Sequence, residues 1–326
     1  MSLPKAFVAQ RIQDAGLDIL RGKVDFRLWE DDVSPDRATL LDVVKDVEGL
    51  LSSIPVRVDR ELFEAAPRLR VVSNYAVGYD NIDVAEATRR GILVTNTPGV
   101  LTAATADLTM TLILMTARRV MEADAFLRSG KWKNWHPNLL VGREVSGATL
   151  GIIGMGQIGQ AVARRAKGFD MKILYFDAVR RPEIESSLGA RFVQTEELLR
   201  ESDFVSLHCV LNDSTRGMIG EEQLKMMKKT AILINAARGP LVDQAALFRA
   251  CAQGWIWGAG LDVFEKEPVP LSEPLLQLRN VVTLPHVASA TNVSREGMAR
   301  KSAENMLAAL TGRKPENLVN PEAWKS

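Results

Sequence analysis

The chain has 326 residues, which is enough for about two domains that each bury their own core. Its 41 basic and 40 acidic residues give a formal net charge of +1, so neither nucleic acid nor a membrane is an expected partner. Only two cysteines occur, which disfavours a disulfide framework and a cysteine-rich metal site. The apolar run near the start is too short for a signal peptide, and we expect a cytoplasmic protein without a bound metal.

The first hundred residues alternate short apolar runs with helical stretches. Strands are expected at residues 6–9, 26–29, 49–53, 70–73 and 92–95. Helices are expected at residues 34–45, 59–66 and 84–90, among others. Strands that alternate with helices pair in parallel, so this region predicts an α/β domain.

A long helix is expected next, over about residues 102–129, with Thr102 as its N-cap and Gly130 just past its end. It connects the first series of strands with a second one. The segment after it, GKWKNWHPNLL, is interpreted as a loop or an arm. For His136 in this segment we favour packing or a subunit contact over a contact with substrate.

The most informative motif follows at residues 149–177, where a strand, a glycine-rich turn, a helix and a second strand succeed each other. Gly154, Gly156 and Gly159 have the G-x-G-x-x-G spacing of a turn that holds a dinucleotide. The start of the helix supplies free N–H groups for a pyrophosphate, and Asp177 ends the next strand, where a carboxylate can bind the adenosine ribose. The sequence therefore predicts a dinucleotide site, the alternative being a turn that needs glycine only for packing.

This motif opens a second series of expected strands. They cover residues 150–153, 173–176, 191–193, 204–208, 231–234, 258–263 and 281–284. Seven strands suit a doubly wound dinucleotide domain. A last helix is expected at about residues 291–310, with Gly312 and Pro315 just past its end.

Arg238, Glu267 and His286 follow strands of this second series, at the sheet edge where ligands bind. An arginine can hold a carboxylate and polarise the adjacent carbonyl, and a histidine, with an ordinary pKa of about 6.5, can donate a proton. A carboxylate beside that histidine favours its protonated form. Taken singly, each has a structural alternative: a surface ion pair for the arginine, a solvated loop charge for the glutamate and a packing role for the histidine. His208 ends a buried strand and is interpreted as shaping the coenzyme side of the sheet.

These residues lie within a longer run of motifs. The segments are LRVVSNYAVGYDNIDVAEATRRGILVTNTPGVLT, GKWKNWHP, the glycine turn, LINAARGPLVD, GLDVFEKEP and LPHVASAT, in this order. With them the chain resembles the D-isomer-specific 2-hydroxyacid dehydrogenase family, most closely its glyoxylate/hydroxypyruvate reductase branch. The resemblance spans nearly the whole chain and implies that Arg238, Glu267 and His286 are the catalytic residues.

The resemblance also implies a domain organisation. A flavodoxin-like α/β substrate domain would comprise residues 1–99 and 287–326, and a Rossmann-type doubly wound domain would comprise residues 100–286. The segment at about residues 100–148 would be a dimerisation arm, because these enzymes are typically homodimers. The active site would lie in the cleft between the two domains.

The resemblance further assigns ligands to individual residues. Val77 and Gly78 would present backbone N–H groups to the substrate carboxylate, with Ser53 as a weaker candidate and Arg238 and His286 as further substrate contacts. The expected coenzyme-binding residues, with the glycine turn and the strand ends included, are Thr105, Gly154, Gly156, Gln157, Ile158, Gly159, Asp177, His208, Ala236, Arg238, Asp262 and His286.

The expected reaction is the reversible reduction of glyoxylate or hydroxypyruvate to the (R)-2-hydroxy acid. Asp177 favours NAD(H), because a carboxylate binds the ribose hydroxyls and repels a 2′-phosphate, whereas Arg180 and Arg181 leave NADP(H) open. The alternative substrates are 2-ketogluconate and other D-2-hydroxy acids. The alternative of another class is an NAD(H)-sensing, corepressor-like binding protein.

Overall fold

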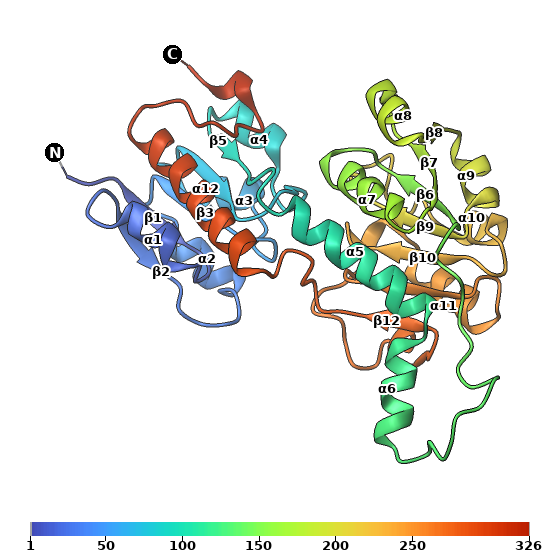
Figure 1. Cartoon of the computed structure of the whole chain (residues 1–326). Coiled ribbons are helices and arrows are strands. Elements are labelled where there is room, and N and C mark those ends of the chain that lie inside the picture. Colours follow the sequence, from blue (N-terminus) through green and yellow to red (C-terminus); the bar gives the residue numbers. More distant parts are fainter. Residues whose placement is uncertain (1, 326) are drawn as a thin grey trace. The chain divides into compact units, whose positions relative to one another are not determined.

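The computed structural model describes residues 2–325 and divides into two compact units. One unit combines the chain up to Leu101 with the chain from Ala290 onward, and the other spans Thr102–Ser289. Each unit contains one parallel sheet with helices packed against it (Figure 1). Both units are therefore α/β, as the alternation of strands and helices predicts.

The first unit has a five-stranded parallel sheet with the order β2-β1-β3-β4-β5. Its strands are β1 (Lys5–Val8), β2 (Asp25–Leu28), β3 (Gly49–Ser52), β4 (Val71–Asn74) and β5 (Leu93–Thr95). Its helices are α1 (Asp14–Leu20), α2 (Arg37–Val43), α3 (Arg60–Ala65), α4 (Val84–Arg89), α12 (Asn292–Leu310) and the 3-10 helix η3 (Pro321–Ala323). The strand order is that of flavodoxin-like folds, and the expected fold class is confirmed.

Helix α12 and the residues after it complete the first unit. The helix packs on α1 and on strands β3 and β4. Gly16 permits the close approach to α1, because a Cβ there would lie 2.6 Å from the carbonyl oxygen of Ala299. Farther along, the buried Asn320 side chain accepts a hydrogen bond from the backbone N–H of Val94 and donates one to the carbonyl of Ile92, at 2.8 and 2.9 Å. The end of the chain is thereby held on the edge strand β5.

The second unit has a seven-stranded parallel sheet with the order β12-β11-β10-β9-β6-β7-β8. Its strands are β6 (Thr149–Ile153), β7 (Lys172–Phe176), β8 (Arg191–Phe192), β9 (Phe204–Leu207), β10 (Ile232–Asn235), β11 (Gly258–Leu261) and β12 (Val281–Thr283). Its helices after β6 are α7 (Gln157–Lys167), α8 (Pro182–Leu188), α9 (Thr195–Glu201), α10 (Glu221–Met226), α11 (Gln244–Ala252) and the 3-10 helices η1 (Gly239–Leu241) and η2 (Pro274–Gln277). This is the doubly wound Rossmann order, and the strand ends fall within two residues of the predicted ones.

The helix that precedes β6 differs from the prediction of one continuous segment. The structure has two helices there, α5 (Thr102–Ala117) and α6 (Val120–Arg128). They are separated at Arg119, whose backbone is left-handed with φ of 54°. The Nε and Nη2 atoms of Arg119 bind the two carboxylate oxygens of Glu122 at 2.9 Å each, which holds the chain in its new direction. Thr102 is the first helical residue and not the N-cap.

Helix α6 and the loop after it extend away from the sheet of the second unit (Figure 1), and the chain returns to the core at the buried Val145. We call residues 120–148 the arm. No residue of α6 is buried. Large apolar side chains are exposed along the arm at Val120, Met121, Leu127, Trp132, Trp135, Leu139 and Val141. Trp135 is 77% exposed. His136 is also exposed, and the Nδ1 atom of its ring accepts a hydrogen bond from the nearby backbone N–H of Asn138 at 3.2 Å. The arm therefore presents apolar surface to the solvent.

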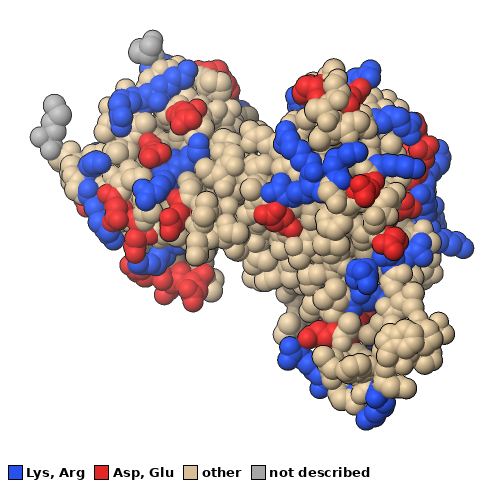
Figure 2. Space-filling model, in the orientation of Figure 1, with Lys and Arg blue, Asp and Glu red and all other residues tan. Residues whose placement is uncertain are grey.

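Charged side chains of both signs are interspersed on the displayed face of each unit (Figure 2). Many of them form pairs, such as Arg70 with Glu48 at 3.2 Å in the first unit and Arg191 with Glu197 at 2.6 Å in the second. This mixture agrees with the net charge of +1. In the part of the chain that the structure describes, no helix has both the length and the apolar character needed to cross a membrane.

Candidate functional site

The glycine-rich turn joins β6 to α7, and its three glycines have different surroundings. Gly154 has a φ of 98°, and a Cβ there would lie 2.5 Å from the backbone nitrogen of Cys209. A Cβ at Gly159 would lie 2.1 Å from the carbonyl oxygen of Gly154. A Cβ at Gly156, in contrast, would meet nothing within 4 Å. The protein's own packing therefore needs Gly154 and Gly159, whereas Gly156 borders open space at the start of a helix.

This open space suits the pyrophosphate of a dinucleotide. The first N–H groups of α7, at Gln157 and Ile158, come where an α-helix has no carbonyl partners of its own. The described first turn of α7 contains no acidic residue, so no side-chain charge there opposes the positive end of the helix dipole. Backbone donors and a positive dipole together form an anion site, and the residues present fit a dinucleotide.

Asp177 follows β7 and contacts the same turn. Its Oδ2 atom accepts a hydrogen bond from the backbone N–H of Met155 at 2.6 Å, and its Oδ1 atom accepts one from Val179 at 2.9 Å. The side chain is half-buried. The carboxylate thus lies between the glycine turn and the loop after β7, where the ribose of a dinucleotide is bound in this fold.

Other predicted coenzyme residues lie at neighbouring strand ends. The order of the sheet reverses between β6 and β9, and such a switch point forms a ligand crevice at the carboxyl ends of the strands. His208, Ala236 and Asp262 come directly after β9, β10 and β11, on the same sheet edge as Gly154. Thr105 is buried in α5, the helix that packs on α7.

His208 has the character of a neutral histidine. Its Nε2 atom lies 2.8 Å from the hydroxyl of Ser206. Burial lowers the pKa of His208 to about 4, so the imidazole is uncharged at neutral pH. An uncharged ring at this position agrees with the interpretation that His208 shapes the coenzyme side of the sheet and does not donate the proton.

His286 and Glu267 form a hydrogen-bonded pair. The Nδ1 atom of His286 lies 2.7 Å from Oε2 of Glu267, and Oε1 of Glu267 accepts a hydrogen bond from the backbone N–H of Phe264 at 2.9 Å. Burial opposes ionisation of Glu267, but the hydrogen bond and charge of His286, the N–H of Phe264 and the charge of Arg238 lower its pKa below the ordinary value. Because an ionised carboxylate only accepts, Nδ1 carries the hydrogen of this bond, and Nε2 is the nitrogen that can donate elsewhere.

The segment around His286 is held by Asp262. The carboxylate of Asp262 is fully buried and accepts hydrogen bonds from the backbone N–H groups of Val287 and Ala288, at 2.8 Å each. Its carbonyl accepts the N–H of His286 at 2.8 Å. His286 has a left-handed backbone with φ of 55°, a conformation that needs support in a residue other than glycine. These three bonds fix the position from which the imidazole extends.

Arg238 follows β10 in the same unit. Its Nη1 atom donates to the carbonyl of Ala237 at 2.9 Å, and its own carbonyl accepts a hydrogen bond from Nδ2 of Asn235 at 2.8 Å. The next residue, Gly239, packs so closely that a Cβ there would lie 1.9 Å from the carbonyl carbon of Phe264. The turn that carries Arg238 is therefore pressed against the loop that leads to Glu267, and the three predicted catalytic residues come from adjoining strand ends.

The predicted substrate residues of the first unit follow β3 and β4. Ser53 is buried, and its hydroxyl has no hydrogen-bond partner among the described residues. Val77 and Gly78 are half-buried in the loop after β4. Their carbonyls accept hydrogen bonds from side-chain amides, that of Val77 from Asn96 and that of Gly78 from Asn74, at 2.8 Å each. The loop is thus fixed through its carbonyls, which leaves its N–H groups to other partners.

Sequence reasoning missed the residues that support these groups. Asn235, Asn74 and Asn96 each donate a hydrogen bond to the backbone carbonyl of a predicted site residue, which is Arg238, Gly78 and Val77 in turn. Each comes at the end of a strand or within one residue of it, and an amide that follows an apolar run at a strand end was the available signal. Gly239 was missed because its close contact is with a segment about 25 residues farther along the chain.

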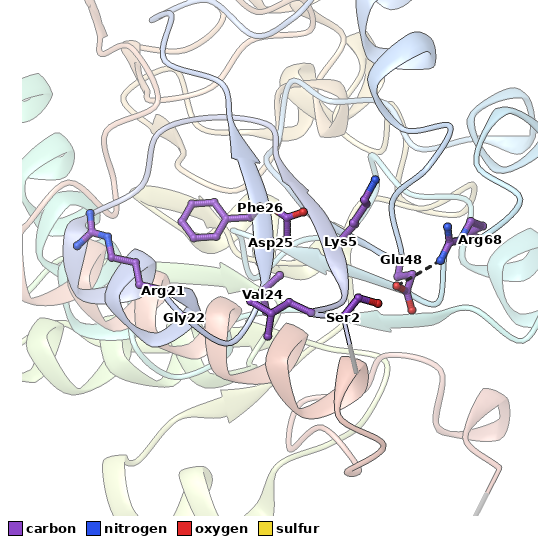
Figure 3. A pocket seen from close by; sticks show the side chains of 10 residues that line it. Ser2, Lys5, Arg21, Gly22, Val24, Asp25, Phe26, Glu48 and Arg68 are labelled. Carbon is purple, nitrogen blue, oxygen red and sulfur yellow. Dashed lines mark ion pairs between the residues drawn. The ribbon is translucent and has the colours of Figure 1, made fainter.

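A hollow of about 570 Å³ lies elsewhere on the first unit (Figure 3). Lys5 and Asp25, which line it, are the first residues of β1 and β2, so the hollow lies at the amino ends of the strands. Arg68 and Glu48 form an ion pair at one end of it, with Nη2 and Oε1 3.7 Å apart. Sheets of this kind bind ligands at the carboxyl ends of their strands, so this hollow is not part of the predicted site.

The second unit brings a histidine that is hydrogen-bonded to a carboxylate to the sheet edge that carries the glycine turn. Reduction of a carbonyl needs a hydride and a proton delivered to one group, and a nicotinamide dinucleotide is the usual hydride source. The fold and the site therefore define a dinucleotide-dependent oxidoreductase. Comparison with known sequences gives the particular family: residues 110–288 match the model of the D-isomer specific 2-hydroxyacid dehydrogenase, NAD binding domain. The chain belongs to this family.

Similar proteins extend over the whole chain. A glyoxylate reductase from Korarchaeum cryptofilum is 55% identical over 323 residues, which cover 99% of this chain and 97% of the relative. One from Thermococcus litoralis is 52% identical and covers 99% of this chain and 98% of the relative. A solved structure from Thermus thermophilus has a TM-score of 0.91 and 45% identity, covering 97% of this chain and 99% of the other. An NADPH-dependent glyoxylate/hydroxypyruvate reductase from Sinorhizobium meliloti, solved with NADP and malonate, has a TM-score of 0.88 and 34% identity, covering 100% of this chain and 99% of the other.

Proposed function

We propose that this protein reduces glyoxylate or hydroxypyruvate to the corresponding (R)-2-hydroxy acid with NADH, and catalyses the reverse oxidation. The observation that carries the proposal is the 2.7 Å hydrogen bond between His286 and Glu267, in the unit that also holds the glycine turn. The names of the archaeal relatives, glyoxylate reductases that are 52–55% identical, support the substrate class.

The proposed catalytic roles follow from the chemistry of each side chain. A bound reduced nicotinamide supplies the hydride to the carbonyl carbon. His286 donates the proton from Nε2 to the carbonyl oxygen, and Glu267 stabilises the charged imidazole and fixes its orientation through Nδ1. Arg238 binds the carboxylate and polarises the carbonyl. Val77 and Gly78 hold the same carboxylate through backbone N–H groups.

The proposed coenzyme site begins at the glycine turn. Gly156, Gln157 and Ile158 hold the pyrophosphate, while Gly154 and Gly159 give the turn its shape. Asp177 binds the ribose diol, which favours NAD(H) over NADP(H). The remaining proposed contacts, from α5 and the strand ends, are Thr105, His208, Ala236, Arg238, Asp262 and His286.

We assign the substrate role to residues 1–99 with 287–326 and the dinucleotide role to residues 100–286. The boundaries between the two compact units lie two and three residues after these proposed ones, at Leu101 and at Ser289. The loop whose carbonyls at Val77 and Gly78 are hydrogen-bonded by asparagine side chains lies in the first unit, and this supports the substrate role of that unit. The glycine turn and the match to the family's NAD-binding domain lie in the second unit.

We further propose that the protein is a homodimer that pairs through the arm. The exposed apolar side chains of the arm would be covered by a second copy, since exposed apolar clusters mark interaction sites. A groove of about 410 Å³ at the base of the arm is lined by apolar side chains and by charged ones, namely Met115, Met121, Trp257, Arg119, Glu122 and Arg279. Sedimentation equilibrium is expected to give twice the chain mass of 35.9 kDa, and a monomer would contradict this part of the proposal.

The working compartment is proposed to be the cytoplasm. Cys209 and Cys251 are free thiols, and burial raises their pKa values to about 11 and 12. Two unpaired thiols suit a reducing compartment.

The proposed reaction is tested by following NADH absorbance with glyoxylate, hydroxypyruvate, pyruvate and 2-ketogluconate. The expected result is rapid oxidation of NADH with glyoxylate or hydroxypyruvate. Faster turnover of 2-ketogluconate would replace the substrate and keep the reaction class. A flat trace with all four acids, together with tight binding of NADH, would instead indicate a coenzyme-sensing protein.

A further inference from the structure

The loop after β7 contains a cluster that the proposed reaction does not use. Arg180 donates from Nε and Nη2 to the two carboxylate oxygens of Glu185, at 2.8 Å each. The hydroxyl of Tyr175 donates to Oε1 of Glu185 at 2.8 Å and accepts the backbone N–H of Arg181 at 2.7 Å. Glu185 therefore ties Arg180 to strand β7 and to helix α8, which neighbour each other in Figure 1.

Tyr175 and Glu185 of this cluster are largely buried, whereas Arg180 lies at the surface. Tyr175 is fully buried, and the side chain of Glu185 is 21% exposed. The side chain of Arg180 is 63% exposed, and its guanidinium carbon lies 5.9 Å from the centre of the Phe192 ring. Hydrogen bonds from Arg180 and Tyr175 lower the pKa of Glu185 to about 2, so the pair stays charged at neutral pH.

The cluster follows directly after the proposed ribose site. Asp177, which accepts hydrogen bonds from Met155 and Val179, is three residues before Arg180. Because Asp177 accepts the backbone N–H of Val179, a ribose bound by Asp177 would lie beside the loop that contains Arg180. An arginine is well suited to a 2′-phosphate, because its planar fork offers several donors. The Nε and Nη2 donors of Arg180 are already committed to Glu185.

We propose that Glu185 sets the coenzyme preference of this enzyme by holding Arg180 away from the 2′ position of the ribose. NADP(H) then meets the carboxylate of Asp177 without the compensating charge of Arg180, whereas NAD(H) carries no 2′-phosphate and does not need that charge. Glu185 acts through Arg180 and is a positioning residue. The inference rests on the proposed function only for the place of the coenzyme, at α7 and Asp177.

The test is Glu185→Gln, which removes the charge that holds Arg180 and keeps the size of the side chain. The ratio of kcat/KM with NADPH to kcat/KM with NADH, measured with glyoxylate, is expected to rise about tenfold, because a charge-assisted arginine–phosphate bond forms. Calorimetry with NADP⁺ and NAD⁺ gives the same ratio of affinities without turnover. The matched control is Glu183→Gln, an exposed acid of the same helix that removes one charge without touching Arg180, and its ratio is expected to stay within twofold of the wild type.

Two further variants separate the arginine from a general charge effect. In Glu185→Gln combined with Arg180→Ala, the gain is expected to disappear, and a gain that persists overturns the proposal. In Arg180→Ala alone, the NADP⁺ dissociation constant is expected to change less than threefold, because the held arginine does not contact the phosphate. A tenfold loss there overturns the proposal even where Glu185→Gln does not fold.

The binding data keep this inference distinct from the proposed reaction. If no 2-oxo acid is turned over, but Glu185→Gln still gains NADP⁺ affinity through Arg180, the proposed reaction is wrong and the coenzyme inference stands. If glyoxylate is reduced and the ratio does not move, the coenzyme inference is wrong and the reaction stands.

Discussion

The two units share a doubly wound parallel architecture, but they use glycine differently in their first strand–helix–strand crossover, which is β1–α1–β2 in the first unit and β6–α7–β7 in the second. In the second unit, Gly154 and Gly159 let strand, turn and helix approach each other and leave open space beside Gly156. In the first unit, the turn after β1 contains no glycine, and Gly16 lies inside α1 against the backbone of α12. The same architecture thus forms a ligand crevice in one unit and a helix contact in the other.

The units also differ in how their sites present polar groups. The second unit offers charged side chains at strand ends, with Glu267 and His286 hydrogen-bonded to one another. The first unit offers a backbone loop whose carbonyls are held by Asn96 and Asn74. Charges suit the chemical step, whereas oriented N–H groups suit recognition of a carboxylate. Substitutions in the two units should therefore affect different kinetic constants.

The largest expected effect is that of His286→Ala, in the second unit. Loss of the proton donor is expected to lower kcat by about 10² to 10⁴, as is usual for a general acid. The dissociation constant of NADH is expected to change far less than kcat, because His286 is one proposed coenzyme contact among several and the turn at α7 is untouched. Steady-state kinetics and fluorescence titration with NADH check both values. A kcat within twofold of the wild type would show that another group donates the proton.

The next largest effect is the dependence of folding stability on pH. It is expected in the second unit, because all three histidines of the chain lie there. Folding lowers the pKa of His208 to about 4, from about 6.5 in an unfolded chain. Between these two pKa values the unfolded state binds more protons than the folded state. The stability that depends on a neutral His208 is therefore complete above pH 6.5 and is lost as the pH falls from there through 4. The contribution amounts to about 3 kcal/mol, at roughly 1.4 kcal/mol for each pH unit of difference.

Urea unfolding of the wild type and of His208→Gln between pH 7.5 and pH 4 measures this contribution. The free energies of unfolding of the two proteins are expected to converge as the pH falls, because glutamine does not titrate. A constant difference across the range would mean that His208 titrates alike in the folded and unfolded chains.

A pair of glycine substitutions tests the comparison of the two crossovers. Gly159→Ala places a Cβ 2.1 Å from the carbonyl oxygen of Gly154, and Gly16→Ala places one 2.6 Å from that of Ala299. Overpacking of this kind costs about 1–3 kcal/mol. We expect Gly159→Ala to weaken NADH binding about tenfold or more, and Gly16→Ala to lower the melting temperature with NADH binding unchanged. Equal loss of NADH affinity in both variants would contradict the division of roles between the crossovers.

The sequence was sufficient for those features that local periodicity or a motif determines. Apolar runs located the strands, and the glycine spacing located the turn before α7. The break between α5 and α6 was not predictable, because Arg119 has no helix-breaking character and takes a left-handed backbone in a particular tertiary setting. The strand-end position of Asn96 was visible in the sequence, but its partner, the carbonyl of Val77, was not. The close packing of Gly239 was also not predictable, since both contacts join segments that are far apart in the sequence.

The smallest expected effect is that of Asn96→Ala, in the first unit. The carbonyl of Val77 and the N–H of Gly78 belong to one peptide group and point in opposite directions, so the bond from Asn96 to that carbonyl aims the N–H. Loss of one such bond is worth about 1 kcal/mol, and the KM for glyoxylate is expected to rise about fivefold with kcat unchanged. The matched control is Asn320→Ala, which removes side-chain bonds to the backbone of Val94 and Ile92 in the same unit and contacts neither Asn96 nor Val77 through them. If both variants raised the KM equally, Asn96 would only stabilise the unit, whereas a rise confined to Asn96→Ala shows that the first unit recognises the carboxylate through an oriented backbone.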